Sequence, residues 1–101
     1  MKLVQMDFPT PEGPFKEEMA EAYKDLAESI TKEPGFIWKF WTENEETKEA
    51  GGIYLFESEE AAKKYVAMHQ ARLESFGVTN IRVRYFDVNE QLSTITKAPL
   101  Q

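Results

Sequence analysis

The only histidine of this chain, His69, is the side chain best suited to move a proton. An imidazole with an ordinary pKa of about 6.5 can accept a proton from an acidic phenol near neutral pH. Helical spacing places His69 between Tyr65 and Leu73 on an apolar stripe. A histidine in such a position is also commonly a core residue bonded to a backbone carbonyl. We predict His69 as a catalytic base facing a pocket, with the core role as the alternative.

Large aromatic side chains with a polar atom form the second group of candidates. Such rings stack on aromatic ligands and orient them, although they also fill cores and interfaces. The predicted substrate-binding residues of this type are Trp38, Trp41, Tyr54 and Tyr65. Arg84 shares a strand face with Arg82 and Phe86, and we predict that it holds a phenolate or carboxylate of the substrate. A surface ion pair with a glutamate is the alternative for Arg84.

Composition excludes several kinds of site. The chain has no cysteine and one histidine, so thiolate chemistry, disulfides, cysteine zinc sites and multi-histidine metal sites are excluded within one chain. The glycine-rich nucleotide-binding motifs, the nucleophile elbow and the H-E-x-x-H motif are also missing. We therefore expect no metal and no cofactor.

The charge and hydropathy of the chain bear on its partners. A net charge of −6 repels a phosphate backbone, so we expect no nucleic-acid partner. No apolar run reaches the roughly 20 residues that span a membrane. The N-terminus lacks the apolar segment of a signal peptide, and we expect a cytoplasmic protein without a membrane partner.

Glycine and proline divide the chain into alternating elements of one domain, residues 1–101. The expected elements are a strand over Lys2–Phe8, a helix from Phe15 to about Glu33, and a hairpin from Glu33 to Phe56. A helix capped by Ser58 and stopped by Gly77 follows, then a strand over Ile81–Val88 and a polar tail over 89–101. The tail carries Leu92 and Ile95 and is expected to pack on the body or on a partner.

The order β-α-β-β-α-β is typical of the ferredoxin-like α+β sandwich, whose two helices cover one face of a four-stranded antiparallel sheet. In the hairpin, strand alternation places Phe36, Trp38 and Phe40 on one side and Ile37 and Trp41 on the other. Both faces of this strand need cover, yet the helices cover only one of them.

The open face of the predicted sheet therefore needs a partner. RNA-binding domains of this topology use aromatic side chains there, but this acidic chain lacks their basic, glycine-containing aromatic motif. Exposure of so apolar a sheet face to water is unfavourable. A second copy of the same sheet remains, and we predict a homodimer through the open sheet face.

The sequence resembles the YdhR-type mono-oxygenases, small proteins of the dimeric α+β barrel superfamily. That superfamily includes cofactor-independent, quinone-forming mono-oxygenases of antibiotic biosynthesis. The segments that carry the resemblance are Ala27–Ile30, Glu33–Phe36, Trp38–Lys39, Trp41–Glu43, Glu49–Phe56, His69 with Ala71–Leu73, and Phe86–Asn89. The resemblance implies the ferredoxin-like fold, assembly into a dimeric α+β barrel, and a mono-oxygenase role on aromatic compounds.

From the resemblance and the candidate residues together we expect an oxygenase without metal or flavin. Its small hydroxy-aromatic substrate would lose a phenolic proton to His69, and the anion would react with molecular oxygen, the co-substrate, to give a quinone. A non-catalytic dimer that binds aromatic ligands or serves a stress response is the first alternative. A haem-binding or haem-degrading protein with His69 as axial ligand is the second. An isomerase or lactone-converting enzyme is not separated from these by the sequence.

Overall fold

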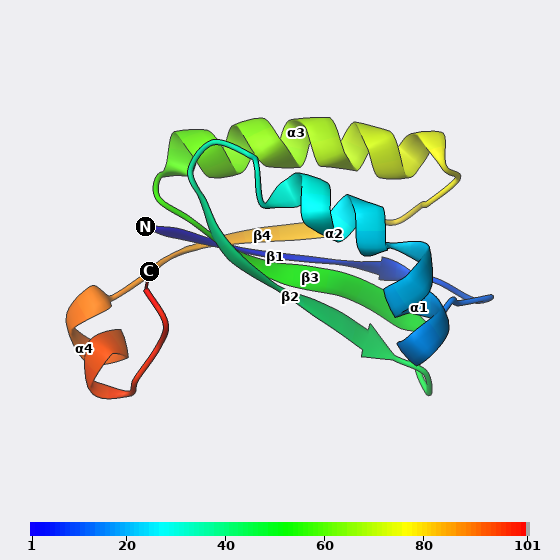
Figure 1. Cartoon of the computed structure of the whole chain (residues 1–101), viewed down its shortest axis with the longest axis horizontal. Helices are drawn as coiled ribbons and strands as arrows, with labels where there is room; N and C mark the ends of the chain where they lie inside the picture. The colour runs from blue at the N-terminus through cyan, green and yellow to red at the C-terminus, as the bar shows by residue number, and fades with distance from the viewer. Residues whose placement is uncertain (101) are drawn as a thin grey trace.

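The computed structural model describes residues 1–100 and shows a four-stranded antiparallel sheet with the helices of residues 16–75 on one face (Figure 1). The elements are β1 (Lys2–Pro9), α1 (Lys16–Ala22), α2 (Lys24–Ile30), β2 (Phe36–Asn44), β3 (Glu49–Phe56), α3 (Glu59–Ser75), β4 (Arg82–Asp87) and α4 (Glu90–Ile95). The strand order is β2-β3-β1-β4, and every neighbouring pair is antiparallel. This arrangement confirms the predicted ferredoxin-like sandwich.

The longest helix, α3, begins and ends where the sequence predicts. The Ser58 hydroxyl accepts a hydrogen bond from the Ala61 N–H at 3.1 Å, which satisfies one of the free donors of the first turn. Gly77 follows the last turn with φ of 91°, a left-handed conformation that glycine adopts without strain. His69 lies on the face of α3 that packs against the sheet, beside Tyr54 of β3, and is 3% exposed.

The first helical segment is broken, and the prediction of one continuous helix from Phe15 to about Glu33 is wrong. Tyr23 separates α1 from α2, with φ of −109° and ψ of 15°. The segment contains no glycine and no proline at this point, so the local sequence does not mark the break. The Tyr23 ring stacks on Trp41 of β2, with ring centroids 6.1 Å apart and planes within 16°. The break therefore coincides with a tertiary contact to the sheet.

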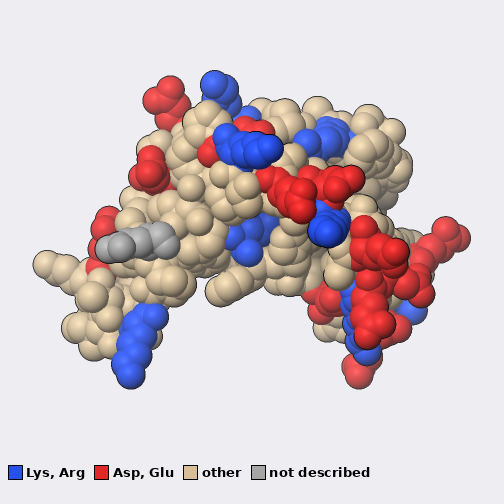
Figure 2. All heavy atoms as spheres, viewed as in Figure 1, with Lys and Arg blue, Asp and Glu red and all other residues tan. Residues whose placement is uncertain are grey.

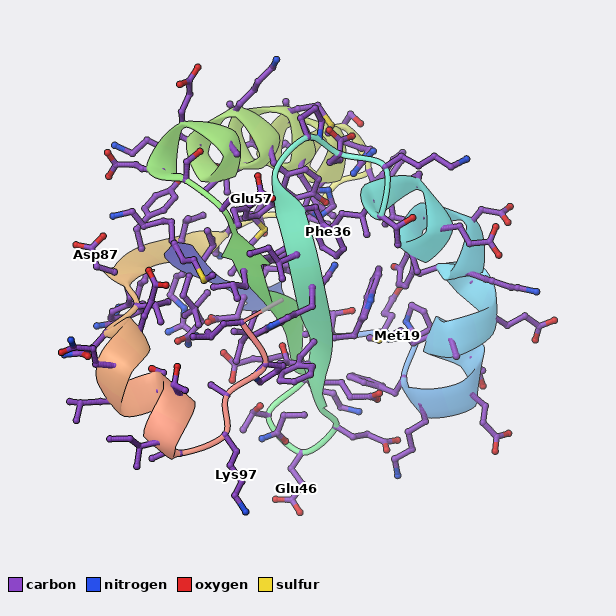
Figure 3. All side chains as sticks on the ribbon, turned by 60° about the vertical axis from the view of Figure 1, so that its left-hand side comes forward. Met19, Phe36, Glu46, Glu57, Asp87 and Lys97 are labelled. Carbon is purple, nitrogen blue, oxygen red and sulfur yellow. The ribbon has the colours of Figure 1, made fainter. Side chains whose placement is uncertain are left out.

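An irregularity at the start of β2 changes the faces of the hairpin. Phe36 lies opposite Phe56, and Trp38 lies opposite the next residue, Leu55, so Ile37 is an extra residue in the register. Phe36 consequently packs edge-on against Phe56 in the core, with centroids 6.1 Å apart, whereas Trp38 and Phe40 lie on the outer face. The prediction that all three aromatics share a face is wrong for Phe36, which Figure 3 labels at the start of β2.

The core lies between the inner face of the sheet and the helices. Its buried cluster comprises Val4, Met6, Ile30, Tyr54, Phe56, Ala62, Tyr65, Val66 and Leu73. Val83 and Tyr85 of β4 pack against this cluster, so this side of the last strand faces the core. Across residues 1–100, none of the helices combines the length and the apolar character that crossing a membrane requires.

The predicted polar tail contains the short helix α4, whose first turn is capped by the Asn89 side chain. After α4 the chain turns back under the sheet, on the side away from α2 and α3 (Figure 1). The Trp38 indole N–H donates a hydrogen bond to the Pro99 carbonyl oxygen. The C-terminal segment therefore packs on the outer face of its own sheet.

Candidate active site

A cavity of about 570 Å³ lies between the inner face of the sheet, the helices α1 and α2, and the C-terminal half of α3. Its apolar walls include Phe8, Met19, Leu26, Leu73, Phe76 and Val78. Figure 3 shows Met19 on α1 in the region between that helix and β2. A concave, largely apolar space with a few polar groups is the usual form of a small-molecule site.

Three of the six predicted site residues line this cavity: Trp41, Tyr54 and His69. Tyr65 is buried behind them, stacked on His69 with centroids 5.2 Å apart and 5.5 Å from the Tyr54 ring. The fold thus brings one strand residue from β2, one from β3 and two residues from α3 into a single aromatic group.

The other two predicted residues, Trp38 and Arg84, lie on the outer face of the sheet. Trp38 stacks on Phe40, with centroids 4.6 Å apart. The Arg84 guanidinium lies 5.0 Å from the centroid of the Phe86 ring. These two side chains are separated from His69 by the sheet itself, because strand residues alternate between its faces. Neither side chain lines this cavity, and their predicted contact with a substrate stays a prediction.

His69 is held by a neighbour one helical turn away. Arg72 Nη2 donates a hydrogen bond to His69 Nδ1 at 2.7 Å. Because a guanidinium can only donate, Nδ1 is the acceptor and the neutral ring carries its proton on Nε2. Burial, then the positive charges of Lys39 and Arg72, lower the pKa of His69 to about 3. His69 is therefore a neutral hydrogen-bond donor, and the nitrogen that could accept a proton is already in use.

Lys39 is a cavity residue that the sequence analysis did not select. Its ammonium nitrogen lies 3.3 Å from the centroid of the Trp41 ring and 4.6 Å from that of Tyr54. Burial, and secondarily the charge of Arg72, lower the pKa of Lys39 from 10.5 to about 7. The amine is thus divided between its charged and neutral forms near neutral pH.

The two buried tyrosines keep their protons throughout the physiological range. Burial raises the pKa of Tyr54, and it raises the pKa of Tyr65 to about 12. The Tyr65 hydroxyl and the Arg72 Nε are both buried, and neither has a hydrogen-bond partner within residues 1–100. These groups can offer hydrogen bonds to a bound molecule or to water.

Simple spacing could have found both overlooked residues. Lys39 precedes Trp41 by two positions, so the two share a strand face. Arg72 follows His69 by three positions, so the two are neighbours on a helix surface. The described residues contain no group of three histidine, cysteine or acidic side chains that could hold a metal ion.

The chain is an α+β sandwich with a cavity between helices and sheet, and solved structures share its fold. A "putative antibiotic biosynthesis monooxygenase" from Deinococcus radiodurans matches with a TM-score of 0.61 and 11% identity, covering 88% of this chain and 93% of that one. A mutant form of the cofactor-independent oxygenase SnoaB from Streptomyces nogalater gives a TM-score of 0.63 and 14% identity over 87% and 92%.

A third structure, the structural-genomics protein YJCS, has a TM-score of 0.60 and 20% identity over 86% of this chain and 99% of that one. At these identities the likeness shows the fold alone. The sequence itself matches the family described as "Putative mono-oxygenase ydhR" over residues 3–99. The chain therefore belongs to this mono-oxygenase family. No match is found among curated proteins.

Proposed function

We propose that this protein is a mono-oxygenase that acts on small hydroxy-aromatic compounds, with molecular oxygen as co-substrate and without metal or flavin. The observation that carries the proposal is the cavity of about 570 Å³ in which Trp41, Tyr54 and His69 meet. This cavity has aromatic walls and a few polar groups. The chain belongs to a mono-oxygenase family. The cofactor-independent oxygenase SnoaB, which shares the fold, supports the absence of a cofactor in the reaction.

The chemistry needs an anion, oxygen and an enclosed space. A phenol that loses its proton becomes an electron-rich phenolate, which gives one electron to oxygen and forms a radical pair. The pair combines as a carbon-bound peroxide, and breaking the O–O bond with loss of water leaves a quinone. The phenol ArOH and O₂ are thereby converted into a quinone and H₂O. In this site the His69 Nε2–H and the Tyr54 hydroxyl would stabilise the developing negative charge.

The test is oxygen uptake with a panel of anthrones and hydroquinones. We expect the wild-type protein to consume oxygen well above the rate of autoxidation, and His69→Ala to lower that rate at least tenfold. The matched control for handling and folding is Lys64→Met, which lies on the exposed side of α3. Uptake at the autoxidation rate with every compound would overturn the proposed function.

We also propose that the protein works as a homodimer through the outer face of its sheet, as a dimeric α+β barrel. Two large side chains of that face are exposed, Phe40 at 57% and Phe86 at 39%. Leu92 at 62% and Ile95 at 75% expose further apolar surface on α4. Exposed apolar groups collected on one side of a small protein are typical of a protein interface.

Light scattering after size-exclusion chromatography tests the dimer. We expect the wild type to have twice the chain mass and Phe40→Glu to shift toward the monomer, because a charge would be buried in the interface. Phe76→Glu is the matched control, since Phe76 is 71% exposed at the end of α3, on the helical side. A wild type that stays monomeric at every concentration would exclude this assembly.

A non-catalytic protein that binds aromatic ligands is the second candidate. The observation in its favour is the bond from Arg72 to His69 Nδ1, which removes the imidazole as the expected base. This candidate predicts saturable binding of hydroquinones without oxygen uptake. The oxygen-electrode panel therefore separates the two functions directly.

A further inference from the structure

The cavity lining contains two basic side chains and one acidic side chain, a balance opposite to that of the whole chain. The chain carries a net charge of −6, and Figure 2 shows acidic side chains gathered over α1 and the neighbouring β2–β3 turn. Inside, Lys39 and Arg72 both line the cavity. Among residues 1–100, no carboxylate lies within 4.0 Å of the charged nitrogens of either side chain. An anion in this cavity would meet two basic groups that no carboxylate neutralises by a direct ion pair, and one acidic residue, Asp25.

Six titratable groups face this space from the surrounding elements. They are Tyr23 between α1 and α2, Asp25 on α2, Lys39 on β2, Tyr54 on β3, and His69 and Arg72 on α3. A proton acceptor at neutral pH must hold a free lone pair there. Burial raises the pKa of Tyr54, which keeps its proton. His69 has only an Nε2–H left to offer, because its Nδ1 accepts the bond from Arg72.

Lys39 differs from these groups in its surroundings. Its nitrogen lies over the faces of Trp41 and Tyr54, at 3.3 and 4.6 Å from the ring centroids, without a carboxylate to hold it charged. Burial lowers the pKa of Lys39 to about 7, so a large fraction is a neutral amine at neutral pH. When the amine takes a proton, the indole face stabilises the new ammonium.

We propose that Lys39 is the proton acceptor of this site, and that the cavity selects acidic hydroxy-aromatic compounds, which it binds as phenolates paired with the Lys39 ammonium. This inference rests on the proposed oxygenase function for its catalytic part. It assigns the base to β2 in place of His69, and gives His69 and Arg72 the role of donors around the bound anion.

The proton transfer balances without a further reactant. The phenol O–H bond breaks as the Lys39 nitrogen forms a new N–H bond, which gives a phenolate and an ammonium from two neutral groups. The phenolate then supplies the electrons that reduce oxygen. The ammonium returns its proton to the departing oxygen when the peroxide loses water, and the neutral amine is restored.

Two variants of Lys39 separate proton acceptance from charge and from structure. Lys39→Met keeps an apolar chain of similar length but has no base, whereas Lys39→Arg keeps a cation that cannot become neutral. Lys64→Met is the same substitution at an exposed lysine of α3 and serves as the control. Urea unfolding of all variants checks that each is folded.

The first readout is the spectrum of 4-nitrophenol, whose phenolate absorbs visible light. We expect wild type and Lys64→Met to raise the phenolate fraction below the pH at which free 4-nitrophenol ionises, and Lys39→Met to abolish this effect. We expect Lys39→Arg to bind the phenolate supplied at high pH. An equal shift with Lys39→Met, or no shift with the wild type, would overturn the assignment.

The second readout is the pH profile of oxygen uptake. General bases contribute about 10² to 10⁴ in rate, so we expect at least a 100-fold loss in both Lys39 variants and loss of the rise near pH 7. Uptake that persists in Lys39→Met would overturn the Lys39 assignment and leave the oxygenase function standing. A phenolate shift in the wild type without uptake of oxygen would leave phenolate binding at Lys39 standing and overturn the oxygenase function.

Discussion

A lysine buried among aromatic rings should make this protein less stable than it would be with a neutral side chain at the same position. Replacing Lys39 by methionine keeps an apolar side chain beside the Trp41 face, loses the cation–π contact, and removes the cost of placing an ammonium in the cavity. We therefore expect Lys39→Met to be more stable than the wild type at neutral and acidic pH. A gain in stability at a predicted catalytic residue is typical of functional sites.

The magnitude follows from the pKa of Lys39, which falls from 10.5 to about 7 in the folded protein. At about 1.4 kcal/mol per tenfold change in proton affinity, this fall corresponds to about 5 kcal/mol. The lost cation–π contact with Trp41 offsets about 2 kcal/mol of it. The expected net gain in the free energy of unfolding for Lys39→Met is about 3 kcal/mol below pH 7.

The stability difference between Lys39→Met and the wild type should depend on pH in one direction. Between pH 7 and 10.5 the unfolded chain binds a proton at Lys39 that the folded protein has released, so wild-type stability rises with pH across this window. The advantage of Lys39→Met should therefore be largest below pH 7 and shrink toward pH 10.5. Lys64→Met should show a small difference from the wild type at every pH.

Urea unfolding of the three proteins at pH 6, 8 and 10, followed by tryptophan fluorescence, measures these differences. The reasoning is refuted if Lys39→Met differs from the wild type by the same amount at all three values. It is refuted equally if Lys39→Met is less stable than the wild type at pH 6.

Three further predictions concern His69 and the sheet. The pKa of His69 falls from 6.5 to about 3 on folding, so wild-type stability should decline as pH drops through this window, and urea titrations of His69→Gln should show a smaller decline. A haem titration should leave the Soret band unchanged, because the Arg72 bond keeps a proton on the Nε2 that would bind iron; a shift that His69→Ala removes would contradict this. Gly51→Ala should cost about 3 kcal/mol in urea unfolding, since its Cβ would lie 1.9 Å from the Met6 carbonyl oxygen. Gly77→Ala meets no atom within 4 Å and should cost only about 1 kcal/mol, and equal losses in the two variants would be inconsistent with the close approach at Gly51.

The sequence was sufficient for those features that depend on local chemistry. The change of hydrophobic period gave the order of strands and helices, because each period exposes one apolar face. Ser58 and Gly77 marked both ends of α3, since capping and left-handed turns depend on the side chain at one position. Strict alternation also placed Arg84 and Phe86 on one face of β4, where the structure has them in contact.

The same local rules failed where a contact between distant segments decides the backbone. The extra residue Ile37 in β2 moves Phe36 to the inner face, and only the pairing with β3 reveals it. The break at Tyr23 coincides with its stacking on Trp41, eighteen positions later in the chain. Alternation along β2 and β4 did not show which face of the sheet holds the cavity, and Trp38 and Arg84 lie on the opposite face.

For the candidate site, the sequence determined which chemistry was available, and the tertiary structure decided which group performs it. Residue types alone offered one imidazole, several aromatics and no thiol. Proton affinity depends on burial and on neighbouring charge, which are properties of the assembled fold. The fold pairs Arg72 with His69 and places Lys39 over two aromatic rings, and it thereby moves the expected base from the histidine to the lysine.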